Sequence, residues 1–272
     1  MKKTALFLAF VLLASSFLFS CVRREKDEEI TTEAETVPAD VVVYPEPDGK
    51  KVVCLDAGHG FRDIGCDTDL LEGTEAEVTL GITMLVKSEL EARGISVILT
   101  HDGKTFPSAD EVRALADKAG IQYDEDDIVD NDIFSANERA IYTASIAERE
   151  GIDLFLSLHV NSLPTHPDFS RYEMDYFRDN PYAKALDIFC EELSARLDNE
   201  TKIFADVYDE AFLVTKVGTH PSVLIEMGYA TNEADAKKLN SPDWRQDFAK
   251  KLADACEDWI ATYEEKKKKK NE

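Results

Sequence analysis

Short apolar segments that alternate with helical patterns constrain the fold of this chain more than any other feature. The segments with a strand pattern are 51–55, 95–100, 153–159, 172–177 and 222–227. The segments with a helical stripe of apolar residues are 78–92, 135–150, 180–197 and 242–263. Strands with continuous apolar runs are typical of a sheet that helices cover on both faces. We therefore expect an α/β fold, a single three-layer domain in which helices flank a central, mostly parallel or mixed sheet.

The first 20 residues have the pattern of an export signal. Two lysines precede an apolar stretch at 5–19, which is short for a membrane span of about 20 residues. The segment LFSC at 18–21 resembles a bacterial lipobox, although Phe19 is larger than the usual residue there. We predict a signal peptide at 1–20 and lipidation of Cys21. A cleaved secretory signal and an uncleaved anchor are the alternatives, and all three export the chain.

Acidic residues dominate the rest of the chain. The whole chain of 272 residues has 55 Asp and Glu against 31 Lys and Arg, which gives a net charge of -24. This balance argues against a nucleic-acid partner, because a negative field repels phosphate. Residues 21–49 have no periodic apolar pattern before Val41, so we expect a flexible acidic tether there. We place the globular domain at 50–263 and a solvated, lysine-rich tail at 264–272.

Residues 102–134 interrupt the alternation of strands and helices. They contain an acidic run at 124–127 and a possible short helix at 109–119. We expect a solvated surface insertion. A calcium site is a weaker alternative, because the run lacks the spacing and the glycine of an EF-hand loop.

Four cysteines follow Cys21, and none of them forms a CxxC pair. A zinc ribbon and a thioredoxin-like site are therefore not expected. Cys190 and Cys256 lie on the apolar faces of predicted helices, where we expect them to fill the core. The sequence leaves disulfide pairing open.

Polar residues occur where apolar strands end. His59 follows the first strand within DAGHG, His159 ends the third, and Glu226 lies inside the last. The carboxyl ends of parallel strands meet at one edge of a sheet, so we expect these side chains to converge. A carboxylate in an apolar strand costs several kcal/mol unless it is paired or neutral, which favours a functional role for Glu226. Spacing alone leaves a structural role for each histidine open.

Four segments carry a family resemblance; in chain order they read VVCLDAGHGFRDIG, TEAEVTL, DLFLSLHVNS and PSVLIEMGYATN. Together they resemble the zinc-dependent N-acetylmuramoyl-L-alanine amidases of the amidase-3 type, over residues 51–263. The resemblance implies one Zn²⁺ held by His59, Glu75 and His159. Glu72 and Glu77 are the alternatives to Glu75 as the carboxylate ligand.

The resemblance also implies an activity. Glu226 matches the catalytic acid of the family, and Asn161 and Arg139 match positions that support the site. The implied reaction is hydrolysis of the amide between N-acetylmuramic acid and L-alanine in peptidoglycan. We expect an exported enzyme, anchored to the membrane by lipid and facing the cell wall or periplasm. A regulatory protein partner stays open.

The chain departs from the family pattern at several positions. Phe61 stands where the family often has a second glycine, Thr79 where it often has asparagine, and His101 where it often has arginine. None of these changes removes a proposed ligand or Glu226. Two alternatives remain: another zinc hydrolase or peptidase of the wall stem peptide, and a non-catalytic lipoprotein that binds wall fragments.

Overall fold

The structure is a computed structural model that describes residues 42–45, 48–130, 133–207 and 212–270. The predicted signal peptide, Cys21 and most of the predicted tether lie outside the described residues. Contacts group the chain from Val42 onward into one unit. In the part that is described, no helix combines the length and the apolar character that crossing a membrane requires.

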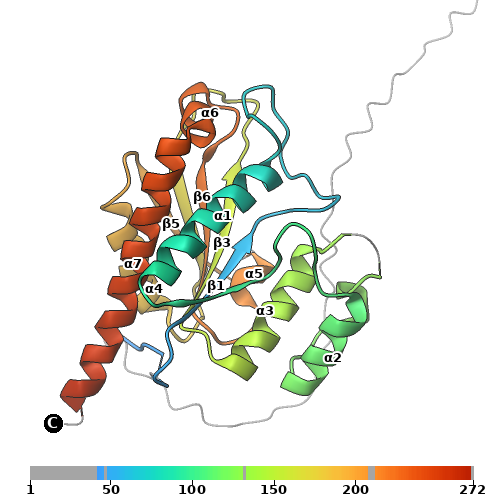
Figure 1. The fold of residues 1–272 in the computed structure, drawn as a ribbon, viewed down its shortest axis with the longest axis vertical. Helices are drawn as coiled ribbons and strands as arrows, with labels where there is room; N and C mark the ends of the chain where they lie inside the picture. The colour runs from blue at the N-terminus through green and yellow to red at the C-terminus, as the bar shows by residue number, and fades with distance from the viewer. Residues whose placement is uncertain (1–41, 46–47, 131–132, 208–211, 271–272) are drawn as a thin grey trace, which may run out of the picture. The chain divides into compact units, whose positions relative to one another are not determined.

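A six-stranded mixed sheet lies at the centre of this unit (Figure 1). Its strands, in spatial order, are β2 (Ser96–Leu99), β1 (Val52–Ala57), β3 (Leu154–Asn161), β6 (Ser222–Tyr229), β4 (Tyr172–Phe177) and β5 (Thr201–Asp206). The first four run parallel, β4 is antiparallel to β6, and β5 is parallel to β4. The expected α/β fold with a mixed sheet is confirmed. The edge strand β5 was not predicted, because its segment TKIFAD has too few apolar residues for a strand buried on both faces.

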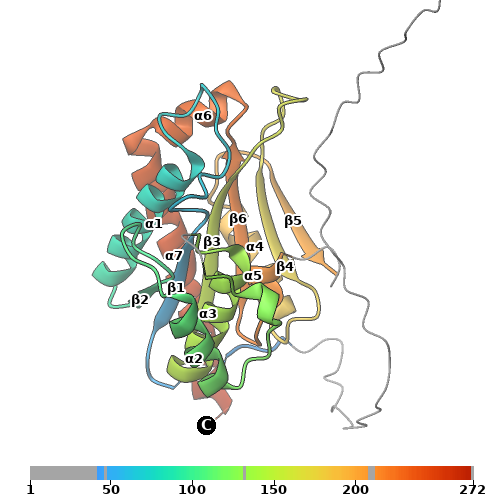
Figure 2. The same cartoon turned by 90° about the vertical axis from the view of Figure 1, so that its right-hand side faces the viewer.

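Helices cover both faces of the sheet (Figures 1 and 2). On one face lie α1 (Glu75–Ala92), α4 (Ala183–Ser194) and α7 (Pro242–Lys270), whose apolar residues form the larger core cluster with the strands. On the other face lie α3 (Ala136–Glu150) and α5 (Leu213–Lys216), which share a smaller cluster. The short α6 (Glu233–Asn240) follows β6. Cys190 and Cys256 are fully buried in the larger cluster, as predicted.

Capping boxes fix where three helices begin. The N-cap and N3 residues pair in the same way in each case: Thr74 with Glu77, Ser108 with Glu111, and Ser135 with Glu138. Each N-cap hydroxyl accepts from the N3 backbone N–H while the N3 carboxylate accepts from the N-cap backbone N–H. In α1 this cap makes Glu75 the first helical residue, at the end of the helix nearest the carboxyl edge of the sheet.

The insertion is not merely a solvated surface segment, so that expectation was wrong. The predicted helix, α2 (Ala109–Ala119), packs on α3, and Figure 2 shows the two side by side. They enclose a separate apolar cluster, whose buried members are Ala109, Val112, Ala116, Ile128, Phe134 and Ile141. The acidic run at 124–127 is tied to α3, because Asp127 Oδ1 accepts from Asn137 Nδ2 at 2.8 Å. Acidic composition concealed the apolar stripe of α2 in the sequence.

Both ends of the described chain differ from expectation. Helix α7 continues to Lys270, where the sequence indicated a tail from 264. Tyr44, assigned to the tether, packs its ring on Trp259 and Tyr263 with centroid distances of 5.3 and 6.5 Å. Trp259 Nε1 in turn donates to the carbonyl of Asp153, directly before β3. The chain therefore joins its domain beside the amino end of β3, away from His159.

His220 makes acid stability testable. Burial lowers the pKa of this histidine from 6.5 to about 4, and its buried Nε2 atom has no hydrogen-bond partner among the residues that the structure describes. Between pH 6.5 and 4 the unfolded chain binds a proton that the folded chain refuses, so folding stability falls as pH falls. This shift in the pKa of His220 corresponds to a loss of about 3 kcal/mol in the free energy of unfolding.

We predict that His220→Leu removes this loss, because an apolar side chain of similar volume has no proton to bind. The measurement is the free energy of unfolding of the variant and of wild type at a series of pH values from 7 to 4, with a chelator present to remove metal ions. His166→Leu, at an exposed histidine, is the matched control and keeps the wild-type slope. An unchanged slope in His220→Leu contradicts the assignment.

Candidate metal centre

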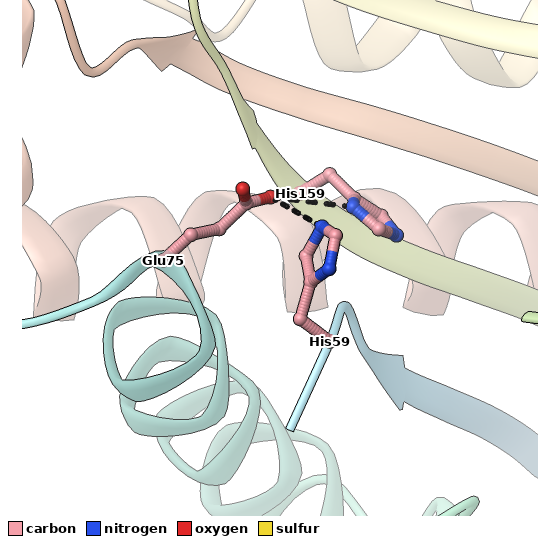
Figure 3. Close-up of side chains that lie close together, drawn as sticks. All are labelled: His59, Glu75 and His159. Atoms are coloured by element: carbon pink, nitrogen blue, oxygen red, sulfur yellow. Dashed lines mark ion pairs between the residues drawn. The ribbon is translucent and has the colours of Figure 1, made fainter. Parts of the chain in front are cut away.

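The carboxyl ends of β1, β3 and β6 bring the chemically important residues together. His59 lies two residues beyond β1, and His159 lies in β3. Glu226 of β6 is paired with His159 in the parallel register, so both side chains leave the sheet on the same face. Glu75 reaches the same edge from the start of α1 (Figure 3). The convergence expected from the strand ends is therefore present in the structure.

Two imidazoles share one carboxylate at this edge. Glu75 Oε1 lies 3.2 Å from His59 Nε2 and 3.3 Å from His159 Nδ1. The two rings meet edge to face with centroids 5.0 Å apart. One ligand atom from each residue falls within 4.8 Å of the others, and the residues that are described hold no other group of this kind. The three donor atoms are therefore close enough together to bind one metal ion.

Backbone amides hold the Glu75 carboxylate in place. Oε1 accepts from Val160 N at 2.9 Å and Oε2 accepts from Cys66 N at 2.8 Å. Burial opposes the charge, but the hydrogen bonds and charges of the two histidines outweigh it and hold the pKa of Glu75 well below its usual range. Glu77 caps α1 and Glu72 is exposed, so both alternatives lie outside the cluster.

Asp63 orients His59 from the side opposite Glu75. Its Oδ2 lies 2.9 Å from His59 Nδ1, which leaves Nε2 directed at Glu75. Burial lowers the pKa of His59, yet the bonds to Asp63 and Glu75 prevail and raise it to about 9. A metal ion would therefore have to displace a proton from this ring. Asp63 was not predicted from the sequence, where its only signal is the spacing of four residues from His59.

Two glycines leave room for the donor side chains. A Cβ atom on Gly58 would stand 2.5–2.7 Å from the ring atoms of His159. A Cβ atom on Gly65 would stand 2.6 Å from Glu75 Oε2 and 2.7 Å from His59 Cδ2. Both distances are far inside van der Waals contact, so any other residue would push a donor out of place.

Glu226 stands beside the cluster with one oxygen unpaired. The residue is partly buried, but its Oε2 atom is buried and has no hydrogen-bond partner among the described residues. Burial raises the pKa of Glu226 well above its usual range, and the negative charges of Glu75, Asp175 and Glu173 raise it further. A carboxyl group with raised proton affinity next to a metal position suits general acid–base work.

Asn161 lies outside the cluster and binds a neighbouring acid. Its Nδ2 donates to Glu173 Oε2 at 3.0 Å, and Glu173 is paired with Glu226 across the antiparallel β4–β6 ladder. Glu173 Oε1 also accepts from Tyr229 Oη at 2.6 Å and from Arg171 Nε at 2.7 Å. These partners fix Glu173 in position next to Glu226.

Arg139 is buried beneath the site and does not join the cluster. Its Nε lies 3.2 Å from Asp56 Oδ1, and the two side chains are 2% and 0% exposed. Asp56 also accepts from Thr100 Oγ1 at 2.6 Å and from Ser157 Oγ at 2.7 Å. This buried ion pair joins β1, β3 and α3 immediately below the loop that carries His59, so its support for the site is structural.

The comparisons with known proteins agree on one family. The family model described as N-acetylmuramoyl-L-alanine amidase matches residues 53–258. The germination-specific N-acetylmuramoyl-L-alanine amidase of Bacillus subtilis is 23% identical over 202 residues, covering 74% of this chain and 76% of that protein. The amidase LytC of the same organism is 29% identical over 216 residues, covering 78% and 35%. The solved amidase AmiC2 of Nostoc punctiforme is 26% identical, with a TM-score of 0.55 and coverage of 78% and 98%.

The close approach of Gly58 to His159 gives a direct test of the donor geometry. We predict that Gly58→Ala weakens metal binding by about 10- to 100-fold, because the added methyl group displaces the imidazole. The measurement is zinc affinity by chelator competition. Gly81→Ala in α1 is the control, since its nearest contact is a flexible arginine tip at 3.4 Å and alanine suits a helix. Equal affinities for the two variants would refute the geometry.

Proposed function

The chain belongs to the amidase-3 family of N-acetylmuramoyl-L-alanine amidases, and we propose that its His–Glu–His cluster is the zinc site of this enzyme. Membership in the family supports peptidoglycan as the substrate. The observation that carries the proposal is the shared Glu75 carboxylate, which holds the donor atoms of His59 and His159 within one coordination sphere.

The donor set fits zinc. His59, His159 and Glu75 would hold Zn²⁺ with two neutral imidazoles and one carboxylate, which are ligand types of catalytic zinc sites. Asp63 supplies the outer hydrogen bond that typically fixes a metal-bound histidine. Cys66 lies nearby, but its thiol is turned to the carbonyl of Val160 at 3.7 Å and stays outside the donor group.

The chain's own residues supply the proton transfers. When bound, zinc acts as a Lewis acid at the scissile carbonyl and makes water nucleophilic near neutral pH. Glu226 accepts the proton of the attacking water and delivers it to the departing nitrogen. The C–N bond breaks, the lactyl group leaves as a carboxylic acid, and L-alanine leaves with a free amino group. The hydrogen bonds of Glu173 to Asn161, Tyr229 and Arg171 fix β4 next to β6, and this keeps the Glu226 side chain in position.

We place this activity outside the cytoplasm, in cell-wall remodelling or turnover. Support comes from the export pattern at 1–20 and from relatives that are described as cell wall amidases. Lipidation of Cys21 would tether the domain through Tyr44, which packs beside the amino end of β3. The catalytic edge lies at the opposite ends of the same strands.

Product analysis tests the proposed activity. The chain without its signal peptide, loaded with zinc, should release intact stem peptides with free L-alanine amino ends from purified peptidoglycan, leaving peptide-free glycan. Mass spectrometry of the products identifies the bond that is cut. Cuts inside the stem peptide would move the assignment to a peptidase, and zinc-loaded protein without products would contradict the activity.

Glu226→Gln tests the proton-transfer role. The amide is nearly isosteric but cannot take a proton, so we predict a loss of turnover of about 100-fold or more with unchanged zinc content and thermal stability. Glu200→Gln, at an exposed position outside the site, is the matched control and keeps full activity. Full activity in Glu226→Gln would eliminate this residue as the base.

A further inference from the structure

The loop that carries His59 has an unusual backbone. His59 and Phe61 have φ values of 64° and 58°, and they are the non-glycine residues with positive φ in the described chain. Residues other than glycine avoid the left-handed region because their Cβ atom crowds the backbone, and a bulky aromatic residue is a clear outlier there. Such a conformation persists only when surrounding contacts hold it. The contacts of the Phe61 ring must therefore offset the strain of its backbone.

The Phe61 ring packs into the insertion. Its centroid lies 4.2 Å from that of Phe106, and Phe106 stacks on Phe134 at 5.5 Å with an interplanar angle of 18°. Phe134 is buried in the α2–α3 cluster, and Phe61 packs against the same cluster. A continuous row of rings therefore runs from the His59 loop into the apolar centre of the insertion.

The second contact of Phe61 is a fixed histidine. The ring centroid lies 5.3 Å from that of His101. His101 is buried; its Nδ1 accepts from Gly103 N at 3.2 Å, so its Nε2 carries the proton and donates to the carbonyl of Ala57 at 2.9 Å. Phe61 is thus held between the His101 imidazole, which is hydrogen-bonded to the end of β1, and the aromatic residues of the insertion.

The turn around Phe61 transmits this position to the metal centre. Gly60 and Asp63 exchange two backbone hydrogen bonds of 2.7 and 3.0 Å, which close a tight turn around Phe61. Asp63 then holds His59 Nδ1 at 2.9 Å. A shift of the ring would therefore move Asp63, and with it the imidazole that faces Glu75.

We propose that Phe61 is a positioning residue through which the insertion at 102–134 sets the zinc affinity of the site. The proposal rests on the proposed function, because it takes His59 as a zinc ligand. The aromatic residues of the insertion pack against the Phe61 ring and fix its position. The ring fixes the turn between Gly60 and Asp63, and Asp63 orients the His59 imidazole for metal binding.

Glycine at position 61 separates this role from simple space filling. Glycine adopts positive φ without strain, so the backbone alone favours Phe61→Gly. If the ring only fills space, the variant binds zinc as tightly as wild type or more tightly. If the ring positions His59, the variant binds zinc more weakly although its backbone is relaxed. The two roles predict opposite changes.

The experiment measures zinc affinity by chelator competition, with the chain lacking only its signal peptide. We expect Phe61→Gly to weaken zinc binding by about 10-fold or more, the size typical of losing a residue that orients a metal ligand. Phe106→Ala, outside the loop, weakens it in the same direction, and the double variant binds like Phe61→Gly alone because Phe106 acts through the Phe61 ring. Phe61→Leu, which keeps an apolar side chain, loses less. Phe212→Ala, at an exposed ring outside the Phe61–Phe106–Phe134 row, is the control and binds like wild type.

Two outcomes overturn the proposal. One is zinc binding in Phe61→Gly that is equal to or tighter than in wild type. The other is unchanged zinc binding in a folded Phe106→Ala variant, and this outcome decides the question even if Phe61→Gly does not fold. Circular dichroism of the metal-free proteins shows which variants are folded. Failure of the proposed function looks different: wild type would bind no zinc, or His59→Ala would bind it as tightly as wild type.

Discussion

The carboxylate of Glu75, shared by two imidazoles, is the interaction on which the site depends. It forms because three parallel strands end at one edge of the sheet and a capped helix begins there, so donors that lie up to 100 residues apart in sequence meet within 4.8 Å. A buried carboxylate is stable only with such partners. The same interaction that satisfies Glu75 therefore also assembles a metal position.

The surrounding structure serves to keep this arrangement rigid. Gly58 and Gly65 leave space that any Cβ would fill, and the buried Asp56–Arg139 pair ties together the strands below the loop. On the outer side, the insertion packs on the loop through Phe61. The donors thus have support from the sheet on one side and from the insertion on the other.

The sequence predicts the fold well because apolar strands and amphipathic helices differ in period, and the strand ends alone indicate His59, His159 and Glu226. Glu75 is different: three acids crowd the start of α1, and only the family resemblance singles it out. Asp63 was not foreseen, because its role depends on a turn closed by backbone bonds to Gly60. The insertion was misjudged, since its acidic composition hid an apolar cluster completed by residues of α3 and the loop. Long-range packing of this kind leaves little trace in local sequence.

Zinc K-edge X-ray absorption of the zinc-loaded chain tests the proposed donor set most directly. We predict one zinc per chain, surrounded only by nitrogen and oxygen at about 2.0–2.2 Å, with the scattering pattern of two imidazoles. Loss of one imidazole in His159→Ala would follow from the same donor set. A sulfur neighbour at about 2.3 Å, which Cys66 alone is placed to supply among the described residues near the site, or a shell without two imidazoles, would contradict it.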